Sequence, residues 1–90
     1  MLDIVASNRF RKDLKLALKR GYKMSLMEAV VDRLAAQEPL EERYRDHLLS
    51  SEYGGFRECH ITPDWLLVYQ VQERELVLFL SRTGTHSDLF

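Results

Sequence analysis

The chain has 90 residues and a net charge of −1, with 46 % of its residues hydrophobic and 30 % charged. This length allows one small domain over residues 1–90, and the composition excludes a disordered chain. No apolar run approaches the roughly 20 residues of a membrane helix, and the segment Met1 to Ala6 is too short and too weakly apolar for a secretory signal. We therefore expect a cytoplasmic protein without a membrane partner, whose single cysteine, Cys59, forms no internal disulfide.

The charges are distributed unevenly along the chain. Residues 1–23 contain seven lysines and arginines against two acids, whereas residues 24–46 and residues 47–90 each contain three against six. A basic first segment is typical of a phosphate-facing surface, although a solvated helix face has the same charge pattern. The acidic middle argues against a general nucleic-acid coat.

The N-terminal part predicts a strand followed by a helix. Residues 2–6 form a short apolar run typical of a strand. Ser7 or Asn8 can cap a helix that ends near Gly21. The apolar residues of this helix recur at helical spacing and form one stripe, namely Phe10, Leu14, Ala17 and Leu18.

A second helix and a loop follow. Ser25 and Glu28 have the spacing of a capping box, and the helix should end before Pro39. Its apolar stripe consists of Ala29, Val30, Val31 and Leu34. Residues 38–55 lack periodicity, so we expect a connecting loop there, of a length at which loops are functional or disordered.

The C-terminal half predicts three strands, at residues 56–61, 65–72 and 75–82, separated by turns at Pro63-Asp64 and Glu73-Arg74. The last eight residues are expected to be a tail. The order β-α-α-β-β-β indicates an α+β fold, with both helices on one face of an antiparallel-rich sheet. The other face of such a sheet can remain open to substrate.

Three histidines are candidates for proton transfer, namely His47, His60 and His86. Metal-free RNA cleavage needs a base for the 2′-hydroxyl, an acid for the leaving 5′-oxygen and positive charge at the phosphorus, which Arg82 could supply. Histidines of this number are also common as surface or structural residues. A zinc site that adds Cys59 to the histidines is a weak alternative. Cys59 and His60 are neighbours on one predicted strand, so their side chains should point to opposite faces of the sheet. We therefore predict no metal and no cofactor.

Strand alternation sorts the remaining candidates. Phe56, Glu58 and His60 should share one face, and Arg57, Cys59 and Ile61 the other. An acid two residues before a histidine can orient its ring, and Asp64 could do the same or cap a turn. Trp65 and Tyr69 are predicted to be core residues rather than base-stacking platforms. For Phe90, packing on the sheet, disorder and stacking on a base all remain open.

Three segments of the C-terminal half resemble the YafQ branch of the RelE toxin family. These are residues 45–47 (Arg-Asp-His), residues 55–69, which include His60-x-x-Pro63-Asp64-Trp65, and residues 82–90, which begin Arg-Thr-Gly-Thr-His. They occur in the order and spacing of the family, and together they cover about half of the chain. The N-terminal half is similar only in its pattern of a strand and two helices.

The resemblance implies an activity and its partners. Such toxins are endoribonucleases that enter the ribosomal A site and cut mRNA through its own 2′-hydroxyl without a metal. A cognate antitoxin neutralises them, and the complex often binds operator DNA. Relatives of the ParE type poison DNA gyrase and lack the histidines, and an inactive homologue could act through complex formation alone. Both remain alternatives.

The resemblance also implies roles for single residues. The catalytic histidines of the family fall on His47, His60 and His86, and its aspartate on Asp64. Glu58 stands where this branch often has aspartate, which leaves its role open. Arg82 matches the transition-state arginine and Phe90 the base-contacting aromatic. We expect His86 to be the general acid, with His47 and His60 sharing the other roles. The residues expected to contact RNA are Lys12, Lys15, Lys19 and Arg57.

Overall fold

The helices and strands of the N-terminal half follow the expected order. The computed structural model describes residues 1–50 and 54–90, and its first elements are β1 (Asp3–Ala6), α1 (Asn8–Lys19) and α2 (Met24–Ala35). Ser7 is the N-cap of α1, because its hydroxyl accepts from the Phe10 amide at 2.9 Å. Gly21 follows the helix with a φ of 81°, a backbone conformation that glycine adopts without strain, and it turns the chain toward α2.

The start of α2 and its apolar stripe differ from the prediction. The helix begins one residue before Ser25, its N-cap is Lys23, and no side chain caps it, so the predicted capping box does not form. Ala29 is exposed, whereas Val30, Val31 and Leu34 are buried. The buried stripe is completed by Met27 and Ala35 instead.

The segment predicted as a loop contains two short elements. A 3-10 helix η1 (Glu42–Tyr44) precedes strand β2 (His47–Leu48), which pairs antiparallel with β3 (Arg57–Thr62). The middle of the segment, residues 51–53, lies outside the described residues. A strand of two residues has no period of its own, which is why the sequence did not indicate it.

The three predicted C-terminal strands are present, and the predicted tail is folded. They are β3, β4 (Trp65–Gln72) and β5 (Val77–Gly84), and helix α3 (His86–Leu89) follows them. The turn between β4 and β5 covers residues 73–76, so β5 begins and ends two residues later than predicted. The tail prediction was wrong because Thr85 and Asp88 form a capping box, which starts a helix of four residues.

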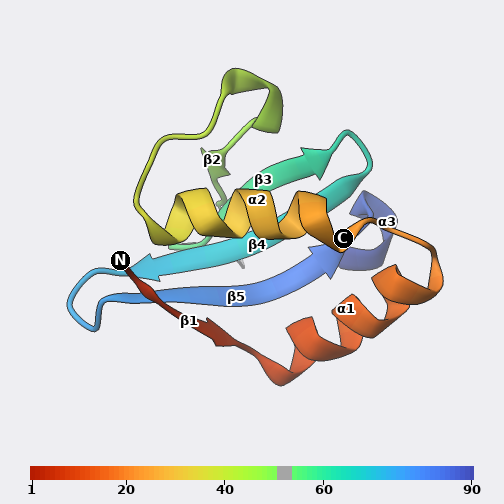
Figure 1. Cartoon of the computed structure of the whole chain (residues 1–90), viewed down its shortest axis with the longest axis horizontal. Helices are drawn as coiled ribbons and strands as arrows, with labels where there is room; N and C mark the ends of the chain where they lie inside the picture. Colours follow the sequence, from red (N-terminus) through yellow and green to blue (C-terminus); the bar gives the residue numbers. More distant parts are fainter. Residues whose placement is uncertain (51–53) are drawn as a thin grey trace.

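In the described part of the chain, one sheet has the strand order β1-β5-β4-β3-β2. β1 lies parallel to β5 and the other neighbours are antiparallel. α2 crosses in front of this sheet, α1 lies along the side of β1 and β5, and α3 lies behind the sheet (Figure 1). The α+β fold with both long helices on one face is therefore confirmed.

The two faces of the sheet have separate apolar clusters. The larger cluster joins α1 and α2 to the face that carries Trp65, Leu67 and Tyr69. Full burial of one such side chain contributes about 1.5–3 kcal/mol to the free energy of unfolding. The smaller cluster, on the opposite face, consists of Leu66, Val68 and Leu89, with Leu49 and Phe56 against it. We call this second surface the open face, because α3 covers only part of it.

A bulge in β5 determines which residues reach each face. Tyr69 pairs with Leu80, but Val68 pairs with Arg82, so Ser81 is an extra residue. Residues that pair across strands share a face, and the bulge therefore places Arg82 on the side of Val68. Thr83 is placed in the core, where its hydroxyl accepts from the Trp65 indole at 2.8 Å and donates to the Leu66 carbonyl at 2.7 Å.

Among the described residues, no helix is long and apolar enough to cross a membrane.

Candidate active site

Glu58 lies between two of the histidines on the open face. β2 pairs with β3 so that His47 stands opposite Glu58, and His60 follows two residues along β3. The Oε1 atom of Glu58 is 3.6 Å from His47 Nε2 and 3.8 Å from His60 Nε2. The predicted face of β3, with Glu58 and His60 together and Cys59 opposite, is confirmed by their pairing with Val68, Leu66 and Leu67.

The Glu58 carboxylate is buried and incompletely bonded. Its side chain is only 8 % exposed, and the Oε2 atom has no hydrogen-bond partner within the described residues. A buried polar atom without a partner costs about 1–3 kcal/mol of stability, so this arrangement is of the kind that a functional site retains.

The protonation of the His47 ring is fixed at one nitrogen. Its Nδ1 atom lies 2.7 Å from the carbonyl oxygen of Arg45, and because a carbonyl only accepts, Nδ1 carries the hydrogen. The Nε2 atom, which faces Glu58, is then the ring nitrogen that has a lone pair in the neutral imidazole. The backbone of Arg45 itself adopts the left-handed conformation, with a φ of 47°.

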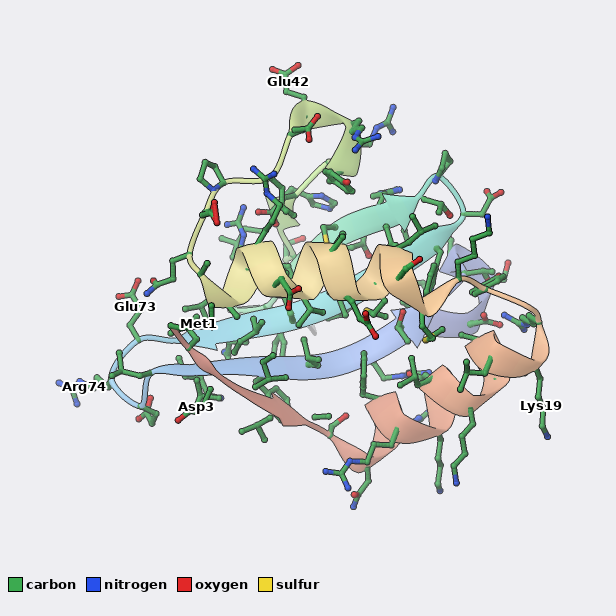
Figure 2. The ribbon with its side chains drawn as sticks, in the orientation of Figure 1. Met1, Asp3, Lys19, Glu42, Glu73 and Arg74 are labelled. Atoms are coloured by element: carbon green, nitrogen blue, oxygen red, sulfur yellow. The ribbon has the colours of Figure 1, made fainter. Side chains whose placement is uncertain are left out.

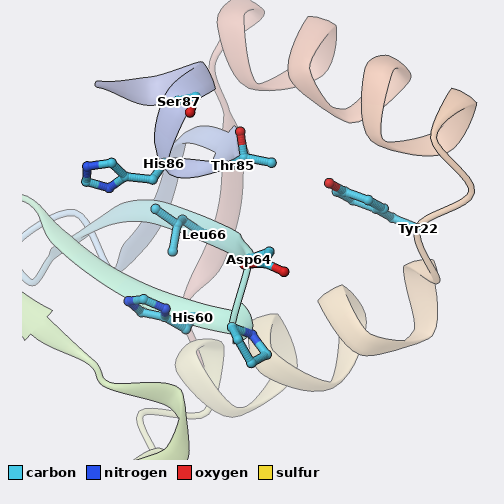
Figure 3. A pocket seen from close by; sticks show the side chains of 8 residues that line it. Tyr22, His60, Asp64, Leu66, Thr85, His86 and Ser87 are labelled. Carbon is cyan, nitrogen blue, oxygen red and sulfur yellow. The ribbon is translucent and has the colours of Figure 1, made fainter.

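His60, Asp64 and His86 line one pocket of about 500 Å³. They come from the end of β3, the β3–β4 turn and the start of α3, and Figure 3 shows them around the same hollow. The remaining lining residues are Tyr22, Pro63, Leu66, Thr85 and Ser87. His47 lies outside this pocket and is linked to it through Glu58.

His86 and Phe90 stand together on the C-terminal segment. Both side chains are exposed, and their rings lie 5.1 Å apart between centroids with a tilt of 37°. The Phe90 amide donates to the His86 carbonyl at 2.9 Å, which closes the helical turn between them. Phe90 is thus an exposed aromatic beside a proton-transfer candidate.

Arg82 is bound to α1. Its Nε and a terminal nitrogen donate to the two carboxylate oxygens of Asp13 at 2.7 and 3.2 Å, and the Thr83 amide donates to the same carboxylate at 3.1 Å. Both side chains of the pair are 14 % exposed. The guanidinium group is therefore held in one orientation beside the open face.

The four residues predicted to contact RNA lie outside the pocket. Lys12, Lys15 and Lys19 are exposed on α1, and Lys19 points away from the body of the protein (Figure 2). Arg57 lies on the helix-covered side, where its Nε donates to Asp46 at 3.2 Å. Asp46 also accepts from the hydroxyl of Tyr69, which is buried as predicted for a core residue.

Within the described residues, no group of three or more histidine, cysteine, aspartate or glutamate side chains is arranged to hold a metal ion. Cys59, the thiol of the alternative zinc set, is buried with 0 % exposure on the covered face. Burial raises the pKa of the Cys59 thiol far above its ordinary value, so without a metal this thiol keeps its proton near neutral pH.

The structure adds residues that the sequence analysis missed. Tyr22, from the α1–α2 connection, packs against Trp65 with the ring centroids 4.9 Å apart and the rings tilted by 50°, and it lines the pocket. Arg43 and Arg45 line a second hollow of about 370 Å³, which His60 and Pro63 also line. Arg45 stands two residues before His47, so the Arg-Asp-His segment carried a signal for it. No local pattern of the sequence connects Tyr22 to the site.

These observations define a small α+β protein with a histidine- and carboxylate-lined pocket beside the open face of its sheet. The chain belongs to the family described as "Bacterial toxin of type II toxin-antitoxin system, YafQ", whose sequence pattern matches residues 2–90. The mRNA interferase toxin YafQ of Escherichia coli (strain B / BL21-DE3) is 40 % identical over 89 residues, which are 98 % of this chain and 95 % of that protein.

Two solved structures are also similar to this chain. A metal-bound toxin from Helicobacter pylori superimposes with a TM-score of 0.95 at 49 % identity, over 100 % of both chains. The toxin of the DinJ-YafQ complex from E. coli superimposes with a TM-score of 0.89 at 40 % identity, over 100 % of this chain and 99 % of that one. The resemblance noted in the C-terminal half thus extends to almost the whole chain.

Proposed function

We propose that this protein is the toxin of a type II toxin–antitoxin system and an endoribonuclease that cleaves mRNA. The observation that carries the proposal is the pocket that joins His60, Asp64 and His86, next to the Glu58 carboxylate and His47. The set contains more than one group able to transfer a proton near neutral pH, as metal-free RNA cleavage requires. Relatives at 40 and 38 % identity, which bear the name mRNA interferase, support the proposal.

In the proposed reaction the 2′-hydroxyl of the RNA attacks the adjacent phosphorus atom. His47 or His60 takes the proton of this hydroxyl, and the Glu58 carboxylate stabilises the resulting imidazolium. His86 gives a proton to the 5′-oxygen as its bond to phosphorus breaks. The products are a 2′,3′-cyclic phosphate and a 5′-hydroxyl end, and no oxidant, metal or external nucleophile is consumed.

Positive charge and base contacts complete the proposed site. Arg82, oriented by Asp13, is proposed to stabilise the charge that develops on the phosphoryl oxygens. Phe90 is proposed to stack on a base, because its ring is 53 % exposed next to His86. Asp64, on the wall of the pocket, is proposed to orient a histidine. Arg57 faces the opposite side of the sheet, so the RNA contact proposed for it lies outside the pocket.

The proposed substrate is mRNA in the ribosomal A site, which assigns the protein to the cytoplasm. The exposed lysines of α1, Lys12, Lys15 and Lys19, are proposed to contact ribosomal RNA. The proposed partner is a cognate antitoxin, by analogy with the relative that was solved together with DinJ. Operator DNA is proposed to be bound only through that complex.

The proposal is tested by mapping transcript 5′ ends after brief induction. We expect new ends within codons, with 5′-hydroxyl chemistry, and no such ends for the His86→Ala variant. Co-expression of a cognate antitoxin should relieve the growth arrest. Arrest with DNA damage and intact transcripts would instead indicate a gyrase poison, and no arrest at all would indicate an inert partner.

The metal-free mechanism is tested in vitro with purified ribosomes programmed with mRNA. EDTA is added after the ribosomes are assembled, and their integrity is checked by sedimentation because they need magnesium. We expect cleavage to persist. Loss of cleavage on intact ribosomes that one defined metal restores would contradict the mechanism, and the metal-bound relative makes this control necessary.

A further inference from the structure

The helix that carries His86 is too short to be stable alone. α3 has four residues, and an isolated helix of that length does not persist in water. Its position must therefore come from contacts with the rest of the protein. Leu89 supplies one of them, because it is buried against Leu66 and Val68 on the open face.

Asp88 supplies a second contact, which reaches to the other end of the chain. Its two carboxylate oxygens accept from the terminal nitrogens of Arg20 at 2.6 and 3.2 Å, across 68 positions of sequence. Arg20 is the C-cap residue of α1. The same carboxylate accepts from the Thr85 amide at 2.8 Å, within the capping box of α3. One side chain thus closes the start of α3 and ties it to α1.

The surroundings of this pair favour the charged form of both groups. Hydrogen bonding to Asp88 raises the pKa of Arg20 above its ordinary value, and donation from Arg20 holds the pKa of Asp88 well below its usual range. Gly84 leaves room for the arrangement, since a Cβ atom there would lie 2.9 Å from Asp88 Oδ2. Both groups therefore carry their charges over the whole range of physiological pH.

We propose that Arg20 is a positioning residue, which acts through Asp88 to hold His86 and Phe90 at the pocket. The proposal rests on the proposed function in one respect, the catalytic role of His86. His86 is the first residue of α3 and Asp88 the third, so a shift of the helix moves the imidazole directly. A displacement of about 1 Å in a reacting group can lower a rate by up to about a hundredfold.

A different role for Arg20 predicts the opposite effects. Arg20 belongs to the basic segment of residues 1–23 and its side chain is 36 % exposed, so it could instead contact RNA phosphates. In that case Asp88 would compete with RNA, and its neutralisation would strengthen ribosome binding. If Arg20 positions α3, neutralisation of Asp88 slows the chemical step and leaves binding unchanged.

The test compares Asp88→Asn, Arg20→Met, their double variant and Arg20→Lys. Asparagine at position 88 retains an oxygen for the Thr85 amide, so the cap survives and the ion pair is lost. Single-turnover cleavage is measured over a range of concentrations of programmed ribosomes. Arg74→Met, in the exposed turn after β4, is the matched control for loss of an arginine.

We expect each single variant to lower the saturating rate by about ten- to a hundredfold, with an unchanged half-saturating ribosome concentration. The double variant should be no slower than the slower single variant, because both remove the same interaction. Arg20→Lys should cleave faster than Arg20→Met but more slowly than the wild type. The control Arg74→Met should cleave at the wild-type rate. A normal saturating rate in Asp88→Asn, or an effect of Arg20→Met on half-saturation alone, would overturn the proposal.

Hydrogen exchange of the free protein separates this proposal from the proposed function. The Leu89 and Phe90 amides donate within α3, to Thr85 and His86. Their exchange should accelerate in Asp88→Asn and Arg20→Met but not in Arg74→Met. Unchanged exchange in Asp88→Asn and Arg20→Met would refute the positioning role of Arg20, whatever the activity of these variants. If the wild-type protein fails to cleave mRNA while exchange accelerates as expected, the proposed function fails and Arg20 still holds α3.

Discussion

His86 is the histidine whose removal separates chemistry from stability. It is exposed at the start of α3 and packs only partly on Phe90. We expect His86→Ala to lower single-turnover cleavage by about 10²–10⁴, since the leaving oxygen then lacks its acid. The free energy of unfolding in a urea melt should change by no more than about 0.5 kcal/mol, as for other surface substitutions. Near-normal cleavage by His86→Ala would indicate that His47 or His60, rather than His86, is the general acid.

Glu58 should show effects of opposite sign on stability and on rate. Its buried carboxylate has an oxygen without a partner in the described residues. Glu58→Gln keeps the shape and removes a desolvated charge, so the folded state should be as stable as the wild type or more stable. Cleavage should slow, because neither His47 nor His60 then has an anion beside its imidazolium. Unchanged cleavage together with lower stability would show that Glu58 is structural.

At the scale of elements, Asp13 connects α1 to the end of β5. It accepts from Arg82 and from the Thr83 amide, at a place where β1 no longer covers the edge of β5. Asp13→Asn should destabilise the protein by about 1–3 kcal/mol, because a hydrogen-bonded charge pair that is largely buried is broken. Cleavage should also fall, as Arg82 loses its fixed orientation. The two effects are measured by urea melts and by single-turnover cleavage under conditions in which the variant is fully folded.

The contact between α3 and α1 should also affect acid stability. The ion pair depresses the pKa of Asp88 in the folded state relative to the unfolded chain, where it is about 3.9. The stability that it contributes is therefore complete above that value and is lost as the pH falls toward the folded pKa. Urea midpoints of the wild type and Asp88→Asn should differ at pH 7, and the difference should shrink only as the pH falls below about 3.9 toward the depressed folded pKa of Asp88. If the difference between the two urea midpoints persists at the lowest pH, the ion pair between Arg20 and Asp88 is not its cause.

The sequence predicted the elements whose patterns are local. The alternation of β3 and the apolar run of β4 place their side chains correctly, because each depends on neighbouring residues alone. β2 and α3 were missed for the opposite reason. β2 exists through its pairing with β3, and α3 depends on Leu89 packing and on Arg20 from the other end of the chain. The same distinction applies to the site, where histidines were recognised by type but Tyr22 and Arg20 have no local signal.

At the scale of the whole molecule, charge limits what the protein can bind without help. The net charge is −1, and the lysines of α1 are balanced by acids elsewhere. A chain with no overall positive charge should hold free RNA weakly, so the ribosome must supply the alignment of the 2′-hydroxyl. We expect cleavage of mRNA on programmed ribosomes to be much faster than cleavage of a free oligonucleotide that contains the same codon. Equal rates on the two substrates would contradict ribosome dependence.

The parallel pairing of β1 with β5 joins segments that are far apart in the chain. Asp3 pairs with Val77, Ser7 donates to the Ser81 carbonyl across 74 positions, and Asp13 meets Arg82 across 69. Such a topology has a high contact order, so the entropy of closing a long loop must be lost before these contacts form. Folding should therefore be slow for a protein of this size. β1 has no strand to pair with until β5 has formed. A nascent chain that has not yet reached β5 cannot assemble the pocket, which delays toxicity until most of the protein has been synthesised.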